Sequence, residues 1–259
     1  FKMDKVINLG IPHVGELIFE SIDTPGLIKC LEVSETWKVL AENVLIKRWK
    51  GKMLEACQYG QTKVVHLLLE RCTSEESGLN IKDELGYTPF MWTCRNGHKD
   101  VVKLLLDHSE RIDLNARRNG GWTAFMLACS NGHKDVVQLF LDNSKRIDLN
   151  ARDNNGRTAL IHACRTQNAQ SNARNKDVVQ LLLNHSDPRI DLNVKDNNGR
   201  TALMLACKYG RKDVVQVFLD NSIRIDLNVK DNDGRTALMI ASQKGRQDIV
   251  QLIKAKLNM

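Results

Sequence analysis

The stretch Asp153-Asn-Asn-Gly-Arg-Thr-Ala-Leu160 decides the fold, because the chain repeats it. The same eight residues return at Asp196–Leu203, and Asp231–Leu238 differs from them only at Asp233. The threonine of this stretch marks a period, because neighbouring members are 35, 35, 43 and 35 residues apart in the series Thr88, Thr123, Thr158, Thr201 and Thr236. Self-similarity at such a period indicates an array of stacked structural repeats.

Each unit has the same local signals. Asp-x-x-Gly predicts a tight turn, and the threonine after it predicts the N-cap of a short helix. A glycine such as Gly132 ends that helix, and the spacing Val136-Val137-x-Leu139 predicts a second, amphipathic helix. An Ile-Asp-Leu-Asn segment then leads to the next turn. One such unit cannot bury its apolar side alone, so the units are expected to stack into a solenoid.

Thr88-Pro89-Phe90, Gly97-His98 and Val101–Leu106 resemble the ankyrin repeat, and the likeness extends over roughly residues 50–259. It implies an all-α fold, a solenoid of about six helix-turn-helix repeats, and a protein-binding role without catalysis. A degenerate first repeat is expected over residues 52–80, and Lys254 and Lys256 are expected to make the last helix a polar terminal cap. The ankyrin-repeat domain is therefore predicted over residues 51–259, preceded by a small helical domain over residues 1–50.

One unit is eight residues longer than its neighbours, and seven of the extra residues fall within Arg165–Lys176. This polar segment is expected to lengthen the loop after the first helix of its unit. Two interpretations stay open: an arm that contacts the ligand, or a surface extension tolerated because a longer loop costs little.

Composition and charge exclude several classes of protein. The 259 residues contain no apolar run long enough for a membrane span, and the first residues lack a secretion-signal pattern. The net charge is +7, but basic residues alternate with acidic ones, so a mixed solvated surface is favoured over nucleic-acid binding. Seven cysteines without a Cys-x-x-Cys pair indicate a reducing compartment, the cytoplasm or the nucleus.

Some recurring residues look chemical but are predicted to be structural. One cysteine recurs in the first helix of successive units, at a spacing too wide for a disulfide or a shared metal ion: Cys57, Cys94, Cys129, Cys164 and Cys207. His98 and His133 are expected to make structural hydrogen bonds at the Gly-His position of the resembled family. We predict no catalytic residue, no metal site and no cofactor.

The resemblance implies that a target protein binds to the turn tips and to the exposed edge of the first helices. The candidate residues are Tyr87, Arg95, Trp122, Arg157, Arg200, Lys208, Tyr209 and Arg235. This groove is predicted to be aromatic in its first half and basic in its second half. It therefore fits a target segment with an apolar anchor and acidic residues. The alternative is that arginine before threonine is a framework choice of the repeat.

Residues 1–50 do not fit the repeat and predict three short helices, Val14–Ile22, Pro25–Leu31 and Ser34 to about Trp49. Thr24 and Ser34 are the expected caps of the second and third helices. So short a segment buries little surface alone, so it is expected to dock on the first repeat, on a partner, or on both.

The order of residues in this segment resembles an F-box, through Ile11, Pro12, Leu17, Ile18, Leu27, Leu31, Val33 and Trp37. The resemblance implies that these residues include the face that docks the Skp-family adaptor of a cullin-RING ubiquitin ligase. The chain would then be a substrate receptor whose ankyrin groove holds the target. The alternative is a helical cap on the first repeat, which would leave a non-degradative scaffold or inhibitor.

Overall fold

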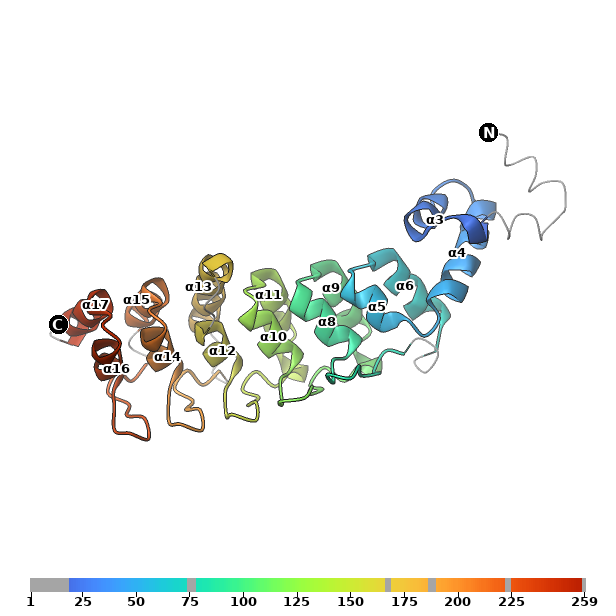
Figure 1. Ribbon diagram of the computed structural model, residues 1–259. Helices are drawn as coiled ribbons and strands as arrows, with labels where there is room; N and C mark the ends of the chain where they lie inside the picture. The colour runs from blue at the N-terminus through green and yellow to red at the C-terminus, as the bar shows by residue number, and fades with distance from the viewer. Residues whose placement is uncertain (1–18, 74–77, 166–168, 186–189, 222–224, 258–259) are drawn as a thin grey trace.

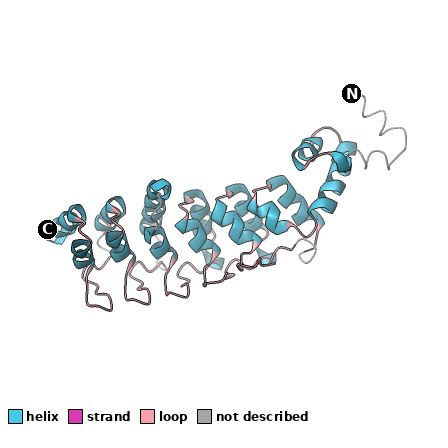
Figure 2. Ribbon diagram, in the orientation of Figure 1, coloured by secondary structure: helices cyan, strands magenta, loops and turns pink. Residues whose placement is uncertain are grey.

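The computed structural model describes residues 19–73, 78–165, 169–185, 190–221 and 225–257, and every regular element in these ranges is a helix (Figure 2). Six helix pairs follow one another, which confirms the predicted all-α repeat solenoid. The first helices of the pairs are α5 (Met53–Gln58), α8 (Pro89–Asn96), α10 (Ala124–Ser130), α12 (Ala159–Arg165), α14 (Ala202–Lys208) and α16 (Ala237–Gln243). The second helices are α6 (Thr62–Arg71), α9 (Lys99–Asp107), α11 (Lys134–Asp142), α13 (Ala169–Asn184), α15 (Lys212–Asp220) and α17 (Gln247–Leu257).

The pairs line up so that the first helices form one row, the second helices form another, and the turns project on one side (Figure 1). Helices pack within each row as well as within each pair. Short 3-10 helices, η1 (Ser109–Arg111) and η2 (Ser144–Arg146), follow α9 and α11. Phe140 of α11 lies 5.6 Å from the ring of Phe90 and 5.3 Å from the ring of Phe125, so aromatic contacts join neighbouring repeats.

The predicted caps begin the first helices. The Thr88 hydroxyl accepts a hydrogen bond from the Met91 N–H at 3.2 Å, and Pro89 occupies the first helical turn, where its missing N–H costs nothing. Gly97 ends α8 at φ +75°, a left-handed conformation that favours glycine. The threonine cap and the glycine predicted from the sequence therefore mark the two ends of α8.

The insertion forms helix and not a longer loop. Helix α13 has 16 residues, whereas α9, α11 and α15 have 9 each, so seven extra residues extend a second helix. The prediction of a lengthened loop was wrong because this repeat has no glycine between α12 and α13, and its Ala, Gln and Arg residues favour helix. Asn175 takes the place that His98 and His133 hold in other repeats. It is fully buried and donates to the carbonyls of Ser130 and Ala163.

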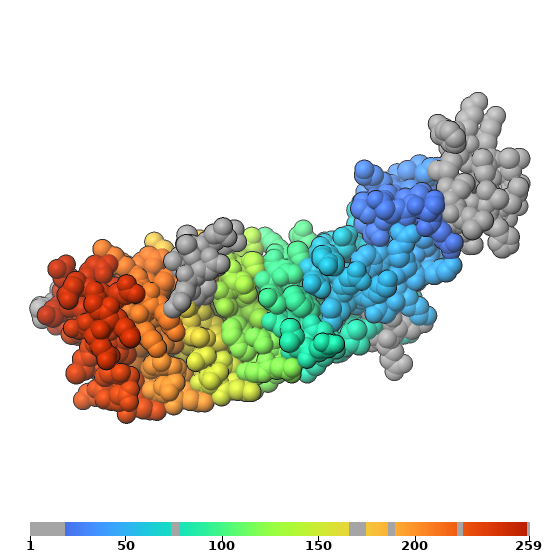
Figure 3. All heavy atoms as spheres, in the orientation of Figure 1, coloured from blue at the N-terminus to red at the C-terminus, as the bar shows by residue number. Residues whose placement is uncertain are grey.

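Two N-terminal helices, α3 (Thr24–Cys30) and α4 (Glu35–Trp49), pack on each other, and α4 also packs on α6 of the first repeat. Asp23 caps α3 by accepting from the Gly26 N–H at 2.9 Å, so Thr24 was the wrong cap, while the prediction of Ser34 as cap of α4 is confirmed. Of the predicted helix Val14–Ile22, residues 14–18 lie outside the described residues, and residues 19–21 are helical. These helices stand at one end of an elongated molecule (Figure 3).

Ion pairs join this N-terminal layer to the first repeat. Arg71 of α6 lies 3.0 Å from Glu42 of α4, and Lys63 of α6 pairs with Glu32 in the turn between α3 and α4. The predicted docking onto the first repeat is therefore present. Separately, no helix in the described part of the chain is both long and apolar enough to cross a membrane.

Candidate functional site

The turn–helix face is the surface formed by the turns 83–88, 118–123, 153–158, 196–201 and 231–236 together with the first helices α8, α10, α12, α14 and α16. Four of these turns begin with aspartate. In the turn at Asp153, Oδ1 accepts from the backbone N–H groups of Asn155 at 2.8 Å and Arg157 at 2.9 Å. The other carboxylate oxygen, Oδ2, is left to accept from a side chain, and that donor differs from repeat to repeat.

In the last two repeats the donor is the arginine before the threonine. The Arg200 guanidinium contacts Asp196 Oδ2 at 2.9 and 3.1 Å, and that of Arg235 contacts Asp231 Oδ2 at 2.9 and 3.0 Å. Burial would raise the pKa of Asp231, but the hydrogen bonds from Arg235 outweigh it and lower that pKa. The charges of these two arginines are thus neutralised by the aspartates of their own turns. This agrees with the alternative that arginine before threonine is a framework choice of the repeat.

In the fourth repeat His162 replaces arginine as the donor. It is fully buried in α12, its Nε2 lies 3.0 Å from Asp153 Oδ2, and the Trp122 ring covers it at 3.8 Å between centroids. Burial lowers the pKa of His162, so the ring is neutral at pH 7 and donates to the carboxylate. The pKa of Asp153 falls to about 2, because the hydrogen bonds from His162 and the backbone outweigh the effect of burial.

Arg157 is consequently displaced from the aspartate of its own turn. Its Nε lies 4.0 Å from Asp196 Oδ2 in the next repeat and is buried without a hydrogen bond. Burial, followed by the charge of Arg165, lowers the pKa of Arg157. Among the three arginines that precede a threonine, Arg157 is therefore the one that its turn does not neutralise.

In the second repeat an indole is the donor, and the surface is aromatic. Trp92 Nε1 donates to Asp83 Oδ2 at 2.9 Å, and its ring stacks on Tyr87 at 4.7 Å. The Arg95 guanidinium covers both rings, at 4.9 Å from Trp92 and 5.3 Å from Tyr87. Tyr87 is only 6% exposed, so it serves as a platform under Arg95 more than as a direct contact for a ligand.

The third repeat reverses the sign of the turn residue, because Arg118 stands where the other four turns have aspartate. Its guanidinium lies between two rings, 4.7 Å from Trp122 and 5.1 Å from Tyr87 of the preceding repeat. Arg118 is not among the binding residues predicted from the sequence. Alignment of the Asp-x-x-Gly positions is the signal that reveals it.

The last candidates lie at the end of the first helices. Lys208 Nζ is 5.7 Å from the Tyr209 ring, and both side chains are partly buried. Tyr59 holds the corresponding place before the glycine of the first repeat and is 62% exposed. Tyr59 is also absent from the predicted binding residues, although the Tyr-Gly pairs at residues 59–60 and 209–210 match. The structure thus brings cations and rings together in the second and third repeats, and it places Lys208 beside Tyr209 in the fifth.

A family model described as ankyrin repeats in three copies matches residues 53–153, 110–189 and 169–259. The chain belongs to the ankyrin-repeat family. Ankyrin repeats indicate a protein–protein interaction module, so the resemblance read from sequence is confirmed for the repeats. These matched residues do not include the N-terminal helices α3 and α4, so they give no support for an F-box.

Similar proteins share the repeat fold. The ankyrin repeat protein EF0377 has a TM-score of 0.65 at 28% identity, over 79% of this chain and 96% of that one. The ankyrin domain of Bcl-3, a member of the IkappaB family, has a TM-score of 0.67 at 26% identity, over 79% and 85%. Osteoclast-stimulating factor 1 from Monopterus albus is 46% identical over 39 residues, 15% of this chain and 18% of that protein. This chain thus spans less than a fifth of that curated relative.

The remaining chemical-looking features of the ankyrin stack are structural. All seven cysteines are buried, and burial raises the pKa of Cys207 to about 12. His98 and His133 bond through Nε2 to the carbonyls of Gln58 at 2.9 Å and Arg95 at 2.8 Å. In the described residues no group of three or more His, Cys, Asp or Glu side chains could hold a metal ion.

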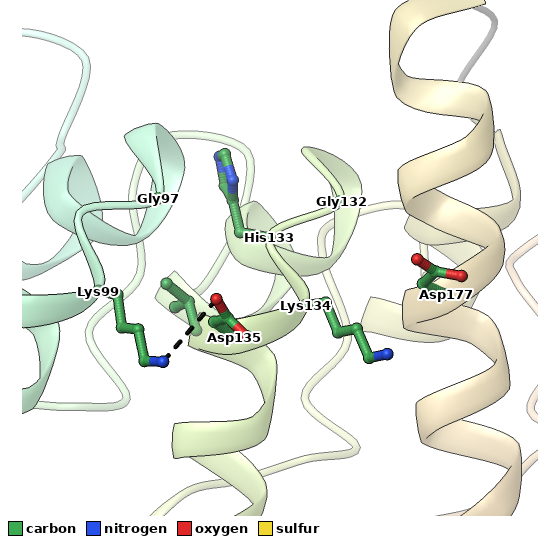
Figure 4. A pocket seen from close by; sticks show the side chains of 8 residues that line it. Gly97, Lys99, Gly132, His133, Lys134, Asp135 and Asp177 are labelled. Atoms are coloured by element: carbon green, nitrogen blue, oxygen red, sulfur yellow. Dashed lines mark ion pairs between the residues drawn. The ribbon is translucent and has the colours of Figure 1, made fainter.

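A shallow depression of about 360 Å³ lies between α9, α11 and α13 (Figure 4). Lys99 Nζ lies 3.8 Å from Asp135 Oδ2 across it, and Lys212 and Asp248 form the same pair at 3.8 Å between α15 and α17. Because the pair recurs along the second helices, the depression is a feature of the ankyrin framework. The turn–helix face is the better candidate for binding.

Proposed function

We propose that this ankyrin protein is a substrate receptor of a cullin-RING ubiquitin ligase. Its N-terminal helices would bind the Skp-family adaptor, and its turn–helix face would bind a target with apolar and acidic residues. The chain would contribute no chemistry of its own, because holding the target near the ubiquitin carrier is enough to accelerate transfer.

The observation that carries the target-binding half is the row of rings and guanidinium groups along the turn–helix face. Tryptophan, tyrosine and arginine contribute most to the energy of protein interfaces. Trp92, Arg95, Arg118 and Trp122 are partly exposed there, side by side on two adjacent repeats. A charged and apolar target segment is the ligand that such a surface favours.

The adaptor-binding half rests on the F-box-like order of residues 9–49 and on the surface of the N-terminal layer. Val33 is 56% exposed and Val39 is 53% exposed, so apolar side chains remain on this layer after it has docked on α6. Leu31 and Trp37 are partly buried, and Trp37 packs edge-on against Phe19 at 5.5 Å. The proposed residues Ile11, Pro12, Leu17 and Ile18 lie outside the described residues.

The second candidate function is a scaffold or inhibitor whose N-terminal helices only cap the solenoid. Leu27, a proposed adaptor contact, is 0% exposed and packs inside the N-terminal layer, and α4 covers α6. Both facts favour a structural role for this layer. The two candidates differ in one property, which is binding to the adaptor.

The deciding experiment is titration of the whole chain with a purified Skp-family adaptor by calorimetry. We expect binding that is lost in the Val33→Asp/Val39→Asp variant and kept in Leu257→Asp, which puts the same charge on an exposed leucine at the far end of the solenoid. Substitution of Leu27 is unsuitable, since a charge at a fully buried position would disturb the fold. No binding by the intact chain would leave the scaffold as the function.

A further inference from the structure

We propose that Arg95 and Arg118, held over the rings of Tyr87, Trp92 and Trp122, form a subsite for acidic side chains of an extended protein segment. The inference rests on the proposed binding of a target to the turn–helix face. It goes further by locating the acidic contact on the second and third repeats, and by assigning it to a residue that the repeat pattern does not supply.

The sign reversal at Arg118 makes this part of the face different from the rest. The turns of the second, fourth, fifth and sixth repeats begin with Asp83, Asp153, Asp196 and Asp231, and each carboxylate is satisfied by a nearby donor. The third turn has a cation in that place. The neighbouring Asp83 accepts from Trp92 and from backbone N–H groups, and no ion pair joins it to Arg118.

Neither guanidinium has a carboxylate partner among the described residues. Arg118 donates through Nη1 to the Asn119 carbonyl at 2.8 Å, and its Nε is buried without a hydrogen bond. Arg95 makes only a long contact of 3.4 Å to the Tyr87 hydroxyl. A partly buried cation with unused donors is stabilised strongly by an anion, since charge-assisted hydrogen bonds are about twice as strong as neutral ones. Arg200 and Arg235 have already made those bonds internally.

The rings fix where the two cations point. Both guanidinium carbons lie within 5.3 Å of the same Tyr87 ring centroid, one from each of two adjacent repeats. Side chains on one side of an extended strand recur every second residue, about 7 Å apart. Two acidic residues at alternate positions of an extended segment could therefore each reach one cation. Exposed Leu85 and Tyr59 on the neighbouring turn and first-helix end offer contacts for a flanking apolar residue.

The test uses the whole chain and phage-displayed random 12-residue peptides. We expect enriched peptides to contain acidic residues beside an apolar one. For a synthetic copy of an enriched peptide, the dissociation constant measured by fluorescence anisotropy should rise at least about tenfold in Arg118→Gln and in Arg95→Gln, because each change removes a hydrogen-bonded charge pair. Arg118→Lys should show a smaller loss.

The matched control is Arg117→Gln, which removes the same charge from the exposed neighbouring residue and should change the dissociation constant less than about twofold. Circular dichroism confirms folding of each variant, and Arg95→Gln remains informative if Arg118→Gln does not fold.

Three results would overturn the inference. The first is equal weakening by Arg117→Gln and Arg118→Gln. The second is enrichment of peptides that contain no acidic residues and whose binding is still weakened by substitution of Trp122. That result would leave the target-binding proposal standing and remove only the carboxylate subsite. The third is a single-stranded 12-nucleotide probe that displaces the peptide and binds more tightly through the same arginines, which would assign the rings and cations to nucleic acid. Failure to enrich any peptide would contradict target binding itself.

Discussion

Every turn aspartate on the turn–helix face has one carboxylate oxygen that accepts from a side chain, and two positions compete to supply the donor. Four residues after the aspartate stands Tyr87, Arg157, Arg200 or Arg235, and nine residues after it stands Trp92, His162, Leu205 or Ile240. Where the later position can donate, it takes the bond, and where it is aliphatic, the arginine does. Because His162 takes the bond to Asp153, Arg157 is left to approach Asp196 of the next repeat.

The first prediction concerns His162→Leu and pH. The pKa of His162 is lowered in the folded chain, so below about pH 6.5, the usual value, the unfolded chain takes up this proton before the folded chain does. Acidification from pH 7.5 to 5.5 should therefore reduce the free energy of unfolding more in the wild type than in His162→Leu. The slopes should differ by up to about 1.4 kcal/mol per pH unit, the effect of one proton.

Urea unfolding at three pH values measures this difference, and the other histidines cancel in the comparison. Leucine suits the site, since Leu127 and Leu205 occupy it in other repeats. In the variant we expect Arg157 to pair with Asp153 as Arg200 pairs with Asp196. Identical pH slopes in the two proteins would show that His162 is not held neutral by burial.

At this scale the sequence alone predicted the tight turn, the role of its aspartate in bonding the turn backbone, and the threonine cap. Each of these depends on neighbours within four residues. The sequence could not predict that Arg200 and Arg235 pair with the aspartates of their own turns while Arg157 does not. Two side chains compete for one carboxylate oxygen, and which of them donates depends on their geometry. Arg118 was within reach of sequence alignment, since it breaks the Asp-x-x-Gly pattern in one unit. The charge available to a ligand therefore lies further towards the first half of the face than predicted.

At the scale of the helix pair, three glycines that follow first helices are covered by a side chain of the next repeat: Gly60, Gly97 and Gly210. Gly97 has φ +75°, and a Cβ built on it would lie 2.4 Å from His133 Nδ1 of the following repeat. His133 is held there by its bond to the Arg95 carbonyl at 2.8 Å. The glycine thus serves both the turn within its repeat and the contact between repeats.

The second prediction separates these two roles. Gly97→Ala should lose about 1–2 kcal/mol from the left-handed backbone and a further amount from the clash with His133. Gly245→Ala is the matched control, because Gly245 has φ +66° at the same place in the last repeat and nothing within 4 Å of its position for a Cβ. Chemical denaturation of both variants gives the comparison. Equal losses of stability would mean that the histidine moves aside freely.

At the scale of the whole molecule, the repeat helices of the described residues that pack closely belong to the same ankyrin repeat or to neighbouring ones. Stability in such a chain is close to a sum over repeats and interfaces. The six pairs and their order were predictable from the spacing of the threonines. The docking of α4 on α6 was predictable only as one of three outcomes, because the pattern of residues 1–50 does not show which apolar side chains remain exposed after docking.

The third prediction uses Leu45, which is buried in α4. Leu45→Ala should destabilise the N-terminal layer by about 2–5 kcal/mol through the cavity it leaves. Hydrogen exchange followed by mass spectrometry should then speed up in α3, α4 and α6 and stay unchanged in α14 to α17. Faster exchange along the entire chain would show instead that the solenoid unfolds as one cooperative unit.

The lengthened helix α13 has a consequence for which insertions this stack accepts. Seven residues amount to almost two complete turns, about 20° short of them. The added segment therefore brings the chain into α13 at nearly the same azimuth as in the nine-residue helices, and α13 still packs on both α11 and α15. An insertion of five residues would rotate that entry point by more than a third of a turn. We therefore expect insertions at the start of a second helix to be restricted to steps that preserve helical phase.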